Sequence, residues 1–188
     1  LDGVEITTLK PATRVKRGLV RTFQINTLFP QLCALEAVTL AICERDRHSG
    51  NWWRGLPSYR AAADEAYAIL SSMQLAEDCT RVTRELAYGQ QRLLEISLAL
   101  AAKPRVLLLD EPAAGVPRNE SSALFEAIAG LPADITVLFI EHDMDIVFTF
   151  ATRIIVLVGG SVLVEGTPTE IAADQRVREV YLGHGKHG

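Results

Sequence analysis

Two adjacent carboxylates, Asp110 and Glu111, follow the short apolar run 106–109. A continuous apolar run of this length predicts a strand that is buried on both faces of a parallel sheet. Such a strand would release the two acids at its carboxyl end, where open α/β sheets bind their ligands. One carboxylate there can hold a divalent cation, and the other can orient and deprotonate a water. An ordinary strand exit before Pro112 would contain the same residues, so this segment alone leaves both interpretations open.

Four further segments carry residues suited to the same chemistry, and they occur in a fixed order along the chain. They are Arg21-Thr22-Phe23-Gln24 at the end of an apolar stretch, Leu86-Ala87-Tyr88-Gly89-Gln90-Gln91-Arg92 at the start of an apolar helix, Ala113-Ala114-Gly115 after the paired acids, and Glu141-His142-Asp143 after the next predicted strand. Each has a structural explanation when taken singly: Gln24 as a polar strand end, Tyr88-Gly89 as a helix entry, and His142 as a turn histidine. Chance explains their joint order poorly.

The apolar pattern also predicts the elements that would position these residues. Strands are expected over 4–6, 19–24, 106–110, 135–140, 154–158 and 162–164, and helices over 34–43, 58–73, 89–103 and 121–130, with short helical patterns in 167–182. Ser58 is the expected cap of the second helix, and Gly159-Gly160 the turn of a closing antiparallel hairpin. Alternating strands and helices predict an α/β fold with a parallel sheet. We expect core strands in 1–28, an inserted helical block in 29–85, the remaining core in 86–182 and a flexible tail in 183–188.

Composition excludes several classes of function. The chain has 188 residues, of which 48% are hydrophobic and 22% charged, as expected for one globular domain. The net charge is −4 and no basic stripe occurs, so nucleic acid is not expected as a partner. The three cysteines lack metal-ligand spacing and are predicted to be reduced thiols in a cytosolic protein. No apolar run approaches the ~20 residues that cross a bilayer, so a membrane role would require a partner.

The order of these segments resembles the nucleotide-binding domain of ATP-binding cassette (ABC) transporters, over nearly the whole chain. It is most similar to the ATP-binding subunits of branched-chain amino-acid and related amide uptake systems, which carry Tyr-Gly-Gln-Gln-Arg where most cassettes carry Gly-Gly-Gln. The resemblance implies a P-loop NTPase-like α/β fold and an ATPase that uses ATP and Mg²⁺. It also implies a second ATPase subunit, identical or not, transmembrane permease subunits and, through these, a periplasmic or extracellular binding protein. The protein would then lie peripherally on the cytoplasmic face of the cell membrane.

The same resemblance implies roles for individual residues. Asp110 corresponds to the Walker B aspartate, which holds Mg²⁺ through water. Glu111 corresponds to the catalytic base that polarises the attacking water. Gln24 matches the Q-loop glutamine, which touches Mg²⁺ or that water, and His142 matches the switch histidine, which contacts the γ-phosphate. Phosphoryl transfer of this kind depends mainly on positioning and charge stabilisation.

Residues Leu86, Ala87, Tyr88, Gly89, Gln90 and Gln91 resemble the signature motif, which acts on ATP held by the other subunit. A glycine-containing turn that opens a helix offers backbone N–H groups and a positive dipole end to an anion. Ala87 stands where a Ser is usual, and the lost hydroxyl contact should cost ~1 kcal/mol. The segment 113–117 corresponds to the D-loop. Its Gly115-Val116-Pro117 differs from the usual Leu-Asp, which leaves its role between subunits open.

A phosphate loop of the form Gly-x-x-x-x-Gly-Lys-Ser/Thr does not occur in the 188 residues. In the family this loop precedes the Q-loop. We therefore expect a cassette truncated before Leu1, and a natural cassette relic is the alternative. The 188 residues alone should neither bind ATP tightly nor hydrolyse it, and missing strands should expose apolar surface and lower solubility.

Two other functions stay open from the sequence. One is a non-transport cassette ATPase of DNA repair or translation, which would be expected to carry a long coiled-coil insertion or a basic surface. The other is an inactive cassette that serves as an interaction module.

Overall fold

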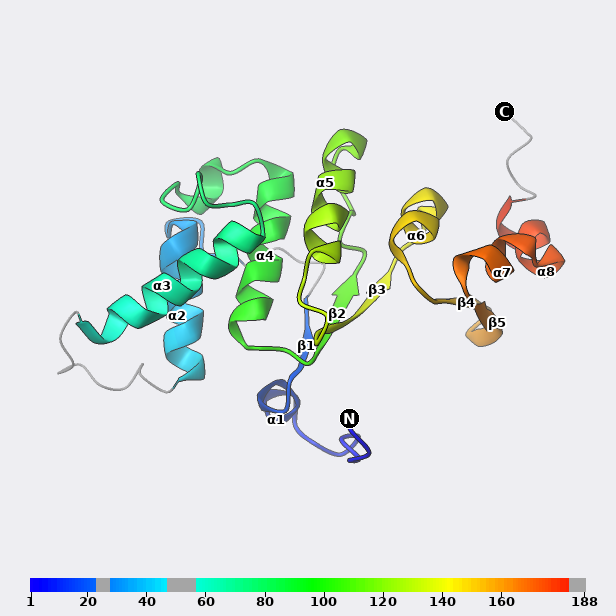
Figure 1. Cartoon of the computed structure of the whole chain (residues 1–188), viewed down its shortest axis with the longest axis horizontal. Helices are drawn as coiled ribbons and strands as arrows, with labels where there is room; N and C mark the ends of the chain where they lie inside the picture. The colour runs from blue at the N-terminus through cyan, green and yellow to red at the C-terminus, as the bar shows by residue number, and fades with distance from the viewer. Residues whose placement is uncertain (23–27, 47–56, 183–188) are drawn as a thin grey trace. The chain divides into compact units, whose positions relative to one another are not determined.

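The computed structural model describes residues 1–22, 28–46 and 57–182 (Figure 1). The predicted Gln24 and the predicted tail 183–188 lie outside the described residues. By its contacts the chain forms two compact units, Leu1–Glu141 and His142–Gly188.

A three-stranded parallel sheet forms the centre of the first unit. Its strands are β1 (Leu19–Arg21), β2 (Val106–Asp110) and β3 (Thr136–Ile140), in the order β1-β2-β3. Leu108 is in register with Arg21 of β1 and with Leu138 of β3. The predicted parallel α/β arrangement is confirmed. Because β2 is the middle strand, the ends of both neighbours flank its carboxyl end.

One face of this sheet is covered and the other is open. Leu107 and Leu109 are 0% and 1% exposed, whereas Leu138 and Ile140 on the opposite face are 53% and 60% exposed. The prediction that β2 is buried on both faces is therefore wrong within the described residues, because Leu108 is only half-buried. The prediction of exposed apolar surface is confirmed at this open face.

Helix α5 (Arg118–Ala129) packs on the covered face of the sheet. The ring of Phe125, which is fully buried, meets the ring of Phe139 edge-on with centroids 5.2 Å apart. Such an edge-to-face pair adds ~1 kcal/mol to the burial of the two rings. Helix α5 also contacts α4 (Tyr88–Ala101). The two helices therefore stand together beside the strand that carries the paired acids.

Helices α2 (Ala34–Arg45), α3 (Pro57–Ser72) and α4 pack against one another (Figure 1). Arg45 joins all three, because its Nη1 donates to Glu65 Oε1 at 2.6 Å and to the carbonyl of Ala101 at 2.9 Å. The predicted cap at Ser58 is wrong, because Pro57 already opens α3, as the fixed φ of proline allows.

The helical block begins and ends at neighbouring positions. Cys33 and Val82 form an isolated antiparallel bridge, and the Thr83 amide donates to the carbonyl of Leu32 at 2.9 Å. A short 3₁₀ turn, η1 (Thr83–Glu85), then leads into α4. The chain thus leaves the sheet after β1 and returns through α4 to the neighbouring strand β2.

The N-terminal region departs from the prediction. No strand forms over 4–6; instead the Val4 amide closes a turn onto the carbonyl of Leu1 at 2.9 Å. Helix α1 (Pro11–Lys16) follows, where the polar sequence gave no apolar period to indicate a helix. Pro11 at its first position and Gly18 after its end, with φ +89°, mark its limits.

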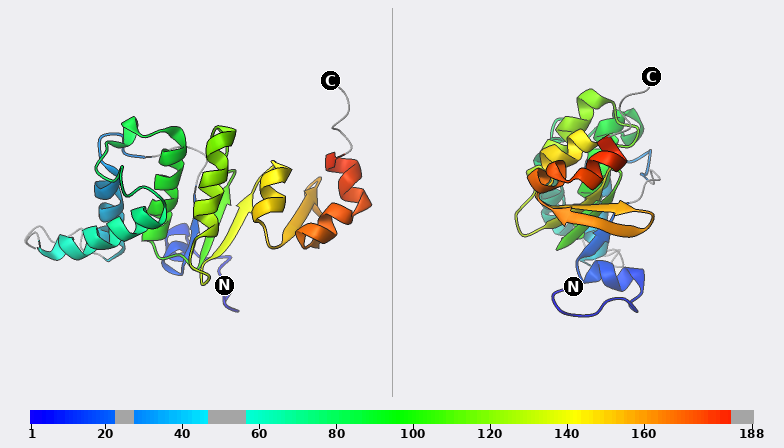
Figure 2. Two further views of the ribbon diagram at one scale, coloured as in Figure 1. Left: turned by 45° about the horizontal axis from the view of Figure 1, so that its top comes forward. Right: turned by 90° about the vertical axis from the view of Figure 1, so that its right-hand side faces the viewer.

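A hairpin forms the centre of the second unit, as predicted. Strands β4 (Ile154–Val158) and β5 (Ser161–Gly166) pair antiparallel and lie side by side in Figure 2. Their turn residues Gly159 and Gly160 have φ of +56° and +81°, which glycine adopts without strain. Its hydrophobic core cluster consists of the buried residues Ile154, Val156, Ile171 and Val177.

In residues 142–182, the described part of the second unit, the helices are α6 (Met144–Phe150), α7 (Pro168–Ala173), α8 (Gln175–Val177) and the π-helical turn η2 (Arg178–Leu182). Helix α6 was not predicted. Its cap is Asp143, whose Oδ1 accepts from the Asp145 amide at 3.0 Å. An Asp before a short apolar segment is a recognisable start signal for a helix.

Candidate functional site

The paired acids emerge at the carboxyl end of the central strand, as the sequence predicted. Asp110 is the last residue of β2, and its side chain is 25% exposed. Arg21, at the end of β1, donates from Nη2 to Asp110 Oδ2 at 2.7 Å. This ion pair was not predicted, because it depends on β1 lying next to β2. The ion pair places the positive charge of Arg21 beside Asp110, the carboxylate that is predicted to hold Mg²⁺.

Glu111 has an unusual backbone conformation. Its φ is +46°, in the left-handed region that few residues other than glycine adopt. Its amide donates to the carbonyl of Ile140, the last residue of β3, at 3.0 Å. Such a conformation costs ~1–3 kcal/mol and is typical of functional sites, where surrounding structure holds the residue in place. Residue 111 accordingly lies at a bend directly after β2.

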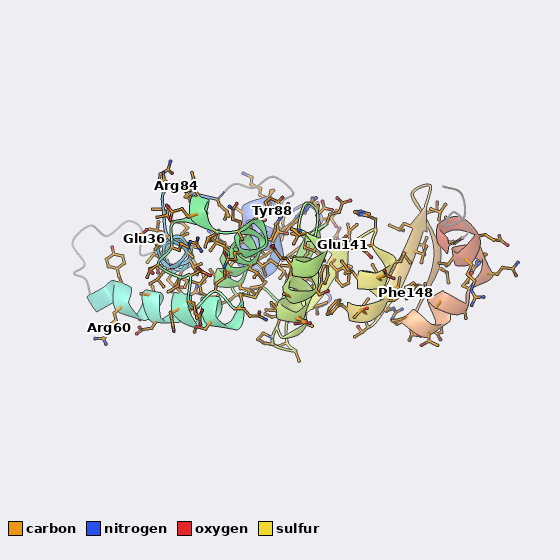
Figure 3. All side chains as sticks on the ribbon, turned by 90° about the horizontal axis from the view of Figure 1, so that it is seen from above. Glu36, Arg60, Arg84, Tyr88, Glu141 and Phe148 are labelled. Carbon is orange, nitrogen blue, oxygen red and sulfur yellow. The ribbon has the colours of Figure 1, made fainter. Side chains whose placement is uncertain are left out.

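The loop 112–117 after the acids is held at several points. The Ala113 amide donates to Glu141 Oε1 at 3.0 Å, and the Ala114 amide donates to the carbonyl of Glu111 at 3.0 Å. Glu141, labelled in Figure 3, directly follows β3. The sequence assigned no role to Glu141 beyond its place in the segment Glu141-His142-Asp143. In the structure, its side chain anchors the loop 112–117 to the end of β3.

The predicted signature segment lies at the start of α4. Ala87 is the N-cap residue and has no side-chain acceptor, while its own amide donates to Gln90 Oε1 at 3.0 Å. Within the described residues, the backbone amides of Tyr88, Gly89 and Gln90 donate no hydrogen bond. First-turn N–H groups without partners, together with the helix dipole, form a site suited to an anion.

Other members of this segment maintain its shape. Leu86 is buried, and its carbonyl accepts from Gln91 Nε2 at 3.0 Å. The side-chain nitrogen Nε2 of Gln90 donates to Asp78 Oδ2 at 2.5 Å. A Cβ on Gly89 would lie 2.6 Å from Glu120 Oε2 on α5, so a larger residue there would require the flexible Glu120 carboxylate to turn away. The predicted contacts of these residues with a nucleotide stay predictions.

For two of the predicted site residues, the described structure does not test a place at the site. Gln24 lies outside the described residues. His142 follows Glu141 directly in the chain and is the first residue of the second unit. Their predicted roles toward the phosphate and the attacking water stay predictions.

The residues present fit Mg²⁺ better than a metal held by protein alone. Among the described residues, no group of three or more His, Cys, Asp or Glu side chains could hold a metal ion. Asp110 offers a partly exposed carboxylate, the hard oxygen ligand that Mg²⁺ prefers. Because Mg²⁺ keeps several waters and binds through phosphates as well, one such carboxylate is a suitable protein contribution.

In residues 1–22, 28–46 and 57–182, no helix is both long and apolar enough to span a membrane.

Comparison with known proteins identifies the family of this chain. Residues 1–114 match the family described as ABC transporter, and residues 161–187 match the family described as branched-chain amino acid ATP-binding cassette transporter. The chain is 40% identical to the high-affinity branched-chain amino acid transport ATP-binding protein BraF of Pseudomonas aeruginosa, over 97% of this chain and 74% of that protein. It is 38% identical to LivG of Escherichia coli, a protein with the same description, over 92% of this chain and 71% of that protein.

Solved structures show the same fold. An ATP-binding cassette of an ABC transporter in its ADP conformation is 30% identical, with a TM-score of 0.79 over 97% of this chain and 75% of that one. A dimeric ATP-binding cassette in a post-hydrolysis state, bound to ADP and Pi, is 25% identical, with a TM-score of 0.70 over 89% and 72% of the two chains. The chain therefore belongs to the ATP-binding cassette family of ABC transporters.

Proposed function

We propose that this chain is the ATP-binding and ATP-hydrolysing part of an importer for branched-chain amino acids or related amides. The observation that carries the proposal is the pair Asp110-Glu111 at the carboxyl end of β2, with Glu111 held in a strained conformation. The relatives BraF and LivG, which are described as branched-chain amino acid transport proteins, support the choice of substrate.

The chemistry assigns separate tasks to the two acids. Asp110 would hold Mg²⁺, which neutralises the negative charge of the phosphates when it is bound. Glu111 would orient the attacking water and accept its proton. We propose that Gln24 assists at the Mg²⁺ or this water, and that His142 contacts the γ-phosphate. Arg21, which donates to Asp110 Oδ2 at 2.7 Å, would compete with the cation for this carboxylate.

The start of α4 would act on a nucleotide held by a second cassette subunit. Its available amides suit a γ-phosphate, and Ala87 would contribute no hydroxyl to it. The dimeric relative bound to ADP and Pi supports a two-subunit arrangement. We therefore propose a homodimer or heterodimer that drives transmembrane permease subunits, and through them receives substrate from a binding protein. This arrangement would hold the chain peripherally at the cytoplasmic face of the membrane.

We also propose that these 188 residues alone bind ATP weakly and do not hydrolyse it. They contain no Gly-x-x-x-x-Gly-Lys-Ser/Thr loop. Charge-assisted hydrogen bonds of such a loop contribute ~1.5–3 kcal/mol each, so losing four would weaken binding by roughly four decades or more. Equilibrium binding of a labelled nucleotide with Mg²⁺ checks this proposal, and a low-micromolar dissociation constant would refute it.

Transport itself tests the main proposal. The natural protein that carries this sequence would be assembled with its permease in lipid vesicles that contain ATP and Mg²⁺. We expect uptake of radiolabelled leucine that requires the binding protein, and we expect Glu111→Gln to abolish it while leaving the assembly intact. ATP-dependent association without any leucine uptake would exclude leucine as the substrate and leave only the related amides of the proposal. Failure to associate with any amino-acid permease would exclude the importer.

A further inference from the structure

A buried arginine joins the start of α4 to the loop that follows the paired acids. The side chain of Arg92 is 7% exposed, and its Nη1 pairs with Glu95 Oε2 at 2.7 Å. Its Nη2 donates to the hydroxyl of Tyr88 at 2.9 Å and lies 3.4 Å from the carbonyl of Ala114. One guanidinium therefore contacts both the first turn of α4 and the loop 112–117.

The ring of Tyr88 rests on the same loop. Gly115 has φ +78°, and a Cβ added to it would lie 3.1 Å from Tyr88 Cε1 and 3.3 Å from Cζ. Arg92 in turn lies over the Tyr88 ring, with its Cζ 5.2 Å from the ring centroid. Figure 3 labels Tyr88 at the first turn of α4. The Tyr88 side chain therefore contacts both the guanidinium and the loop.

A small cavity lies between Arg92 and Glu95 of α4 and the end of β2. It has a volume of about 10 Å³ and is lined by Thr22, Arg92, Glu95, Ile96, Asp110 and Pro112. Arg92 Nε and Glu95 Oε1 are buried and have no hydrogen-bond partner among the described residues. A cavity of this size, with polar atoms of both signs, suits a single water. Such a water would connect the ion pair on α4 to the strand end that carries Asp110.

The energetics favour a positioning role for this cluster over a stabilising one. Burial raises the pKa of Glu95 even though Arg92 opposes the rise. The carboxylate is therefore ionised at a cost, and a buried ion pair of this kind is weak evidence of stability. Its polar groups instead fix a geometry, because removing either partner leaves the other charge unpaired.

Building on the proposed function, we propose that Arg92 is a positioning residue of the ATPase site. It holds the first turn of α4, the loop 112–117 and the end of β2 as one rigid piece. The anion-binding amides of α4 then keep a fixed position relative to Asp110 and Glu111. Without Arg92 the same groups would be present, but the turn and the loop could move independently.

Arg45 supplies a matched control for this role. It also pairs with a glutamate and donates to a backbone carbonyl of α4, but at Ala101, the opposite end of the helix from the site. Replacing either arginine by lysine keeps the charge and removes the planar fork that reaches two partners. A merely structural arginine at position 92 would therefore behave like Arg45.

Amide hydrogen exchange in the natural protein that carries this sequence tests the inference without relying on activity. Arg92→Lys should speed exchange in a peptide covering 112–117 by about tenfold, the equivalent of one lost charged hydrogen bond. Arg45→Lys should leave this peptide unchanged. Tyr88→Phe, which keeps the ring but removes its hydroxyl, should speed exchange by a smaller factor. Unchanged protection in both Arg92→Lys and Tyr88→Phe would overturn the inference.

Steady-state kinetics tests whether the contacts of Arg92 affect catalysis. Arg92→Lys should lower kcat for MgATP by about tenfold with little change in KM, because the lost alignment affects reaction more than nucleotide binding. Arg45→Lys should leave kcat unchanged, and equal losses of kcat in the two variants would contradict the positioning role. A wild-type protein without ATPase activity would refute the proposed function, and the exchange experiment would still decide whether Arg92 holds the loop.

Discussion

Gly115→Ala probes the contact between the loop and α4 most sharply. Gly115 has φ +78°, so any other residue is strained there, and its new methyl group would meet the Tyr88 ring at 3.1–3.3 Å. The conformational cost of alanine in the left-handed region is ~1–2 kcal/mol. Pressing a methyl group into a packed neighbour costs a further ~1–3 kcal/mol. We therefore expect Gly115→Ala to destabilise the first unit by ~2–5 kcal/mol.

Gly160 separates these two contributions. Its φ is +81°, close to that of Gly115, but a Cβ there would meet nothing within 4 Å. Gly160→Ala should therefore cost only the conformational ~1–2 kcal/mol. The difference between the two substitutions measures the clash with Tyr88. In a Tyr88→Ala background, which removes the ring, Gly115→Ala should cost no more than Gly160→Ala.

Hydrogen exchange at the most protected amides of each unit gives the assay, because the two glycines lie in different units. The slowest amides of α4 report the first unit, and those of β4 report the second. The reasoning fails if Gly115→Ala and Gly160→Ala cost the same in the wild-type background. It also fails if Tyr88→Ala does not reduce the cost of Gly115→Ala.

Three further predictions concern charge and capping. Burial raises the pKa of Glu95 above 4.5, so its contribution to stability is fully present below pH 4.5 and is lost as pH rises through the raised value; urea unfolding across this window should show the loss in wild type and not in Glu95→Gln. Hydrogen bonding to Arg45 lowers the pKa of Glu65, so the sign is opposite: its contribution is present above pH 4.5 and is lost as pH falls through the lowered value. Arg45→Met should remove that acid-side loss, and an unchanged pH profile would contradict the assignment. Ala87 has the extended backbone of an N-cap, so Ala87→Ser should stabilise α4 by ~1 kcal/mol in urea unfolding, whereas a destabilised variant would mean that the cap geometry is wrong.

Local sequence signals predicted an element correctly where Pro or Gly residues marked its ends and the apolar pattern agreed with them. Strand β2 has the predicted limits, because its apolar run lies between Pro104 and Pro112. The Gly159-Gly160 hairpin also formed as predicted. Signals failed where an element is short and lacks apolar periodicity, as in α1 and α6, although Pro11 and Asp143 were available as start signals.

Contacts between distant segments could not be read from local pattern. The Arg21–Asp110 pair depends on which strands are neighbours, and the sequence does not state strand order. The open face at Leu138 and Ile140 likewise depends on which segments cover the sheet. Arg92 was visible as part of a motif, yet its contact with Ala114 requires α4 and the loop to be packed together. The residue types of the site were therefore predictable, while the interactions that hold them in place were not.

The most direct test of the central claim is Glu111→Gln in the natural protein that carries this sequence, measured for both MgATP affinity and MgATP hydrolysis. Glutamine keeps the size of the side chain but cannot accept the proton of water, so hydrolysis should fall by about 10²–10⁴-fold while the affinity stays nearly constant. Hydrolysis that persists at the wild-type rate would contradict the account, as would a loss of affinity as large as the loss of hydrolysis.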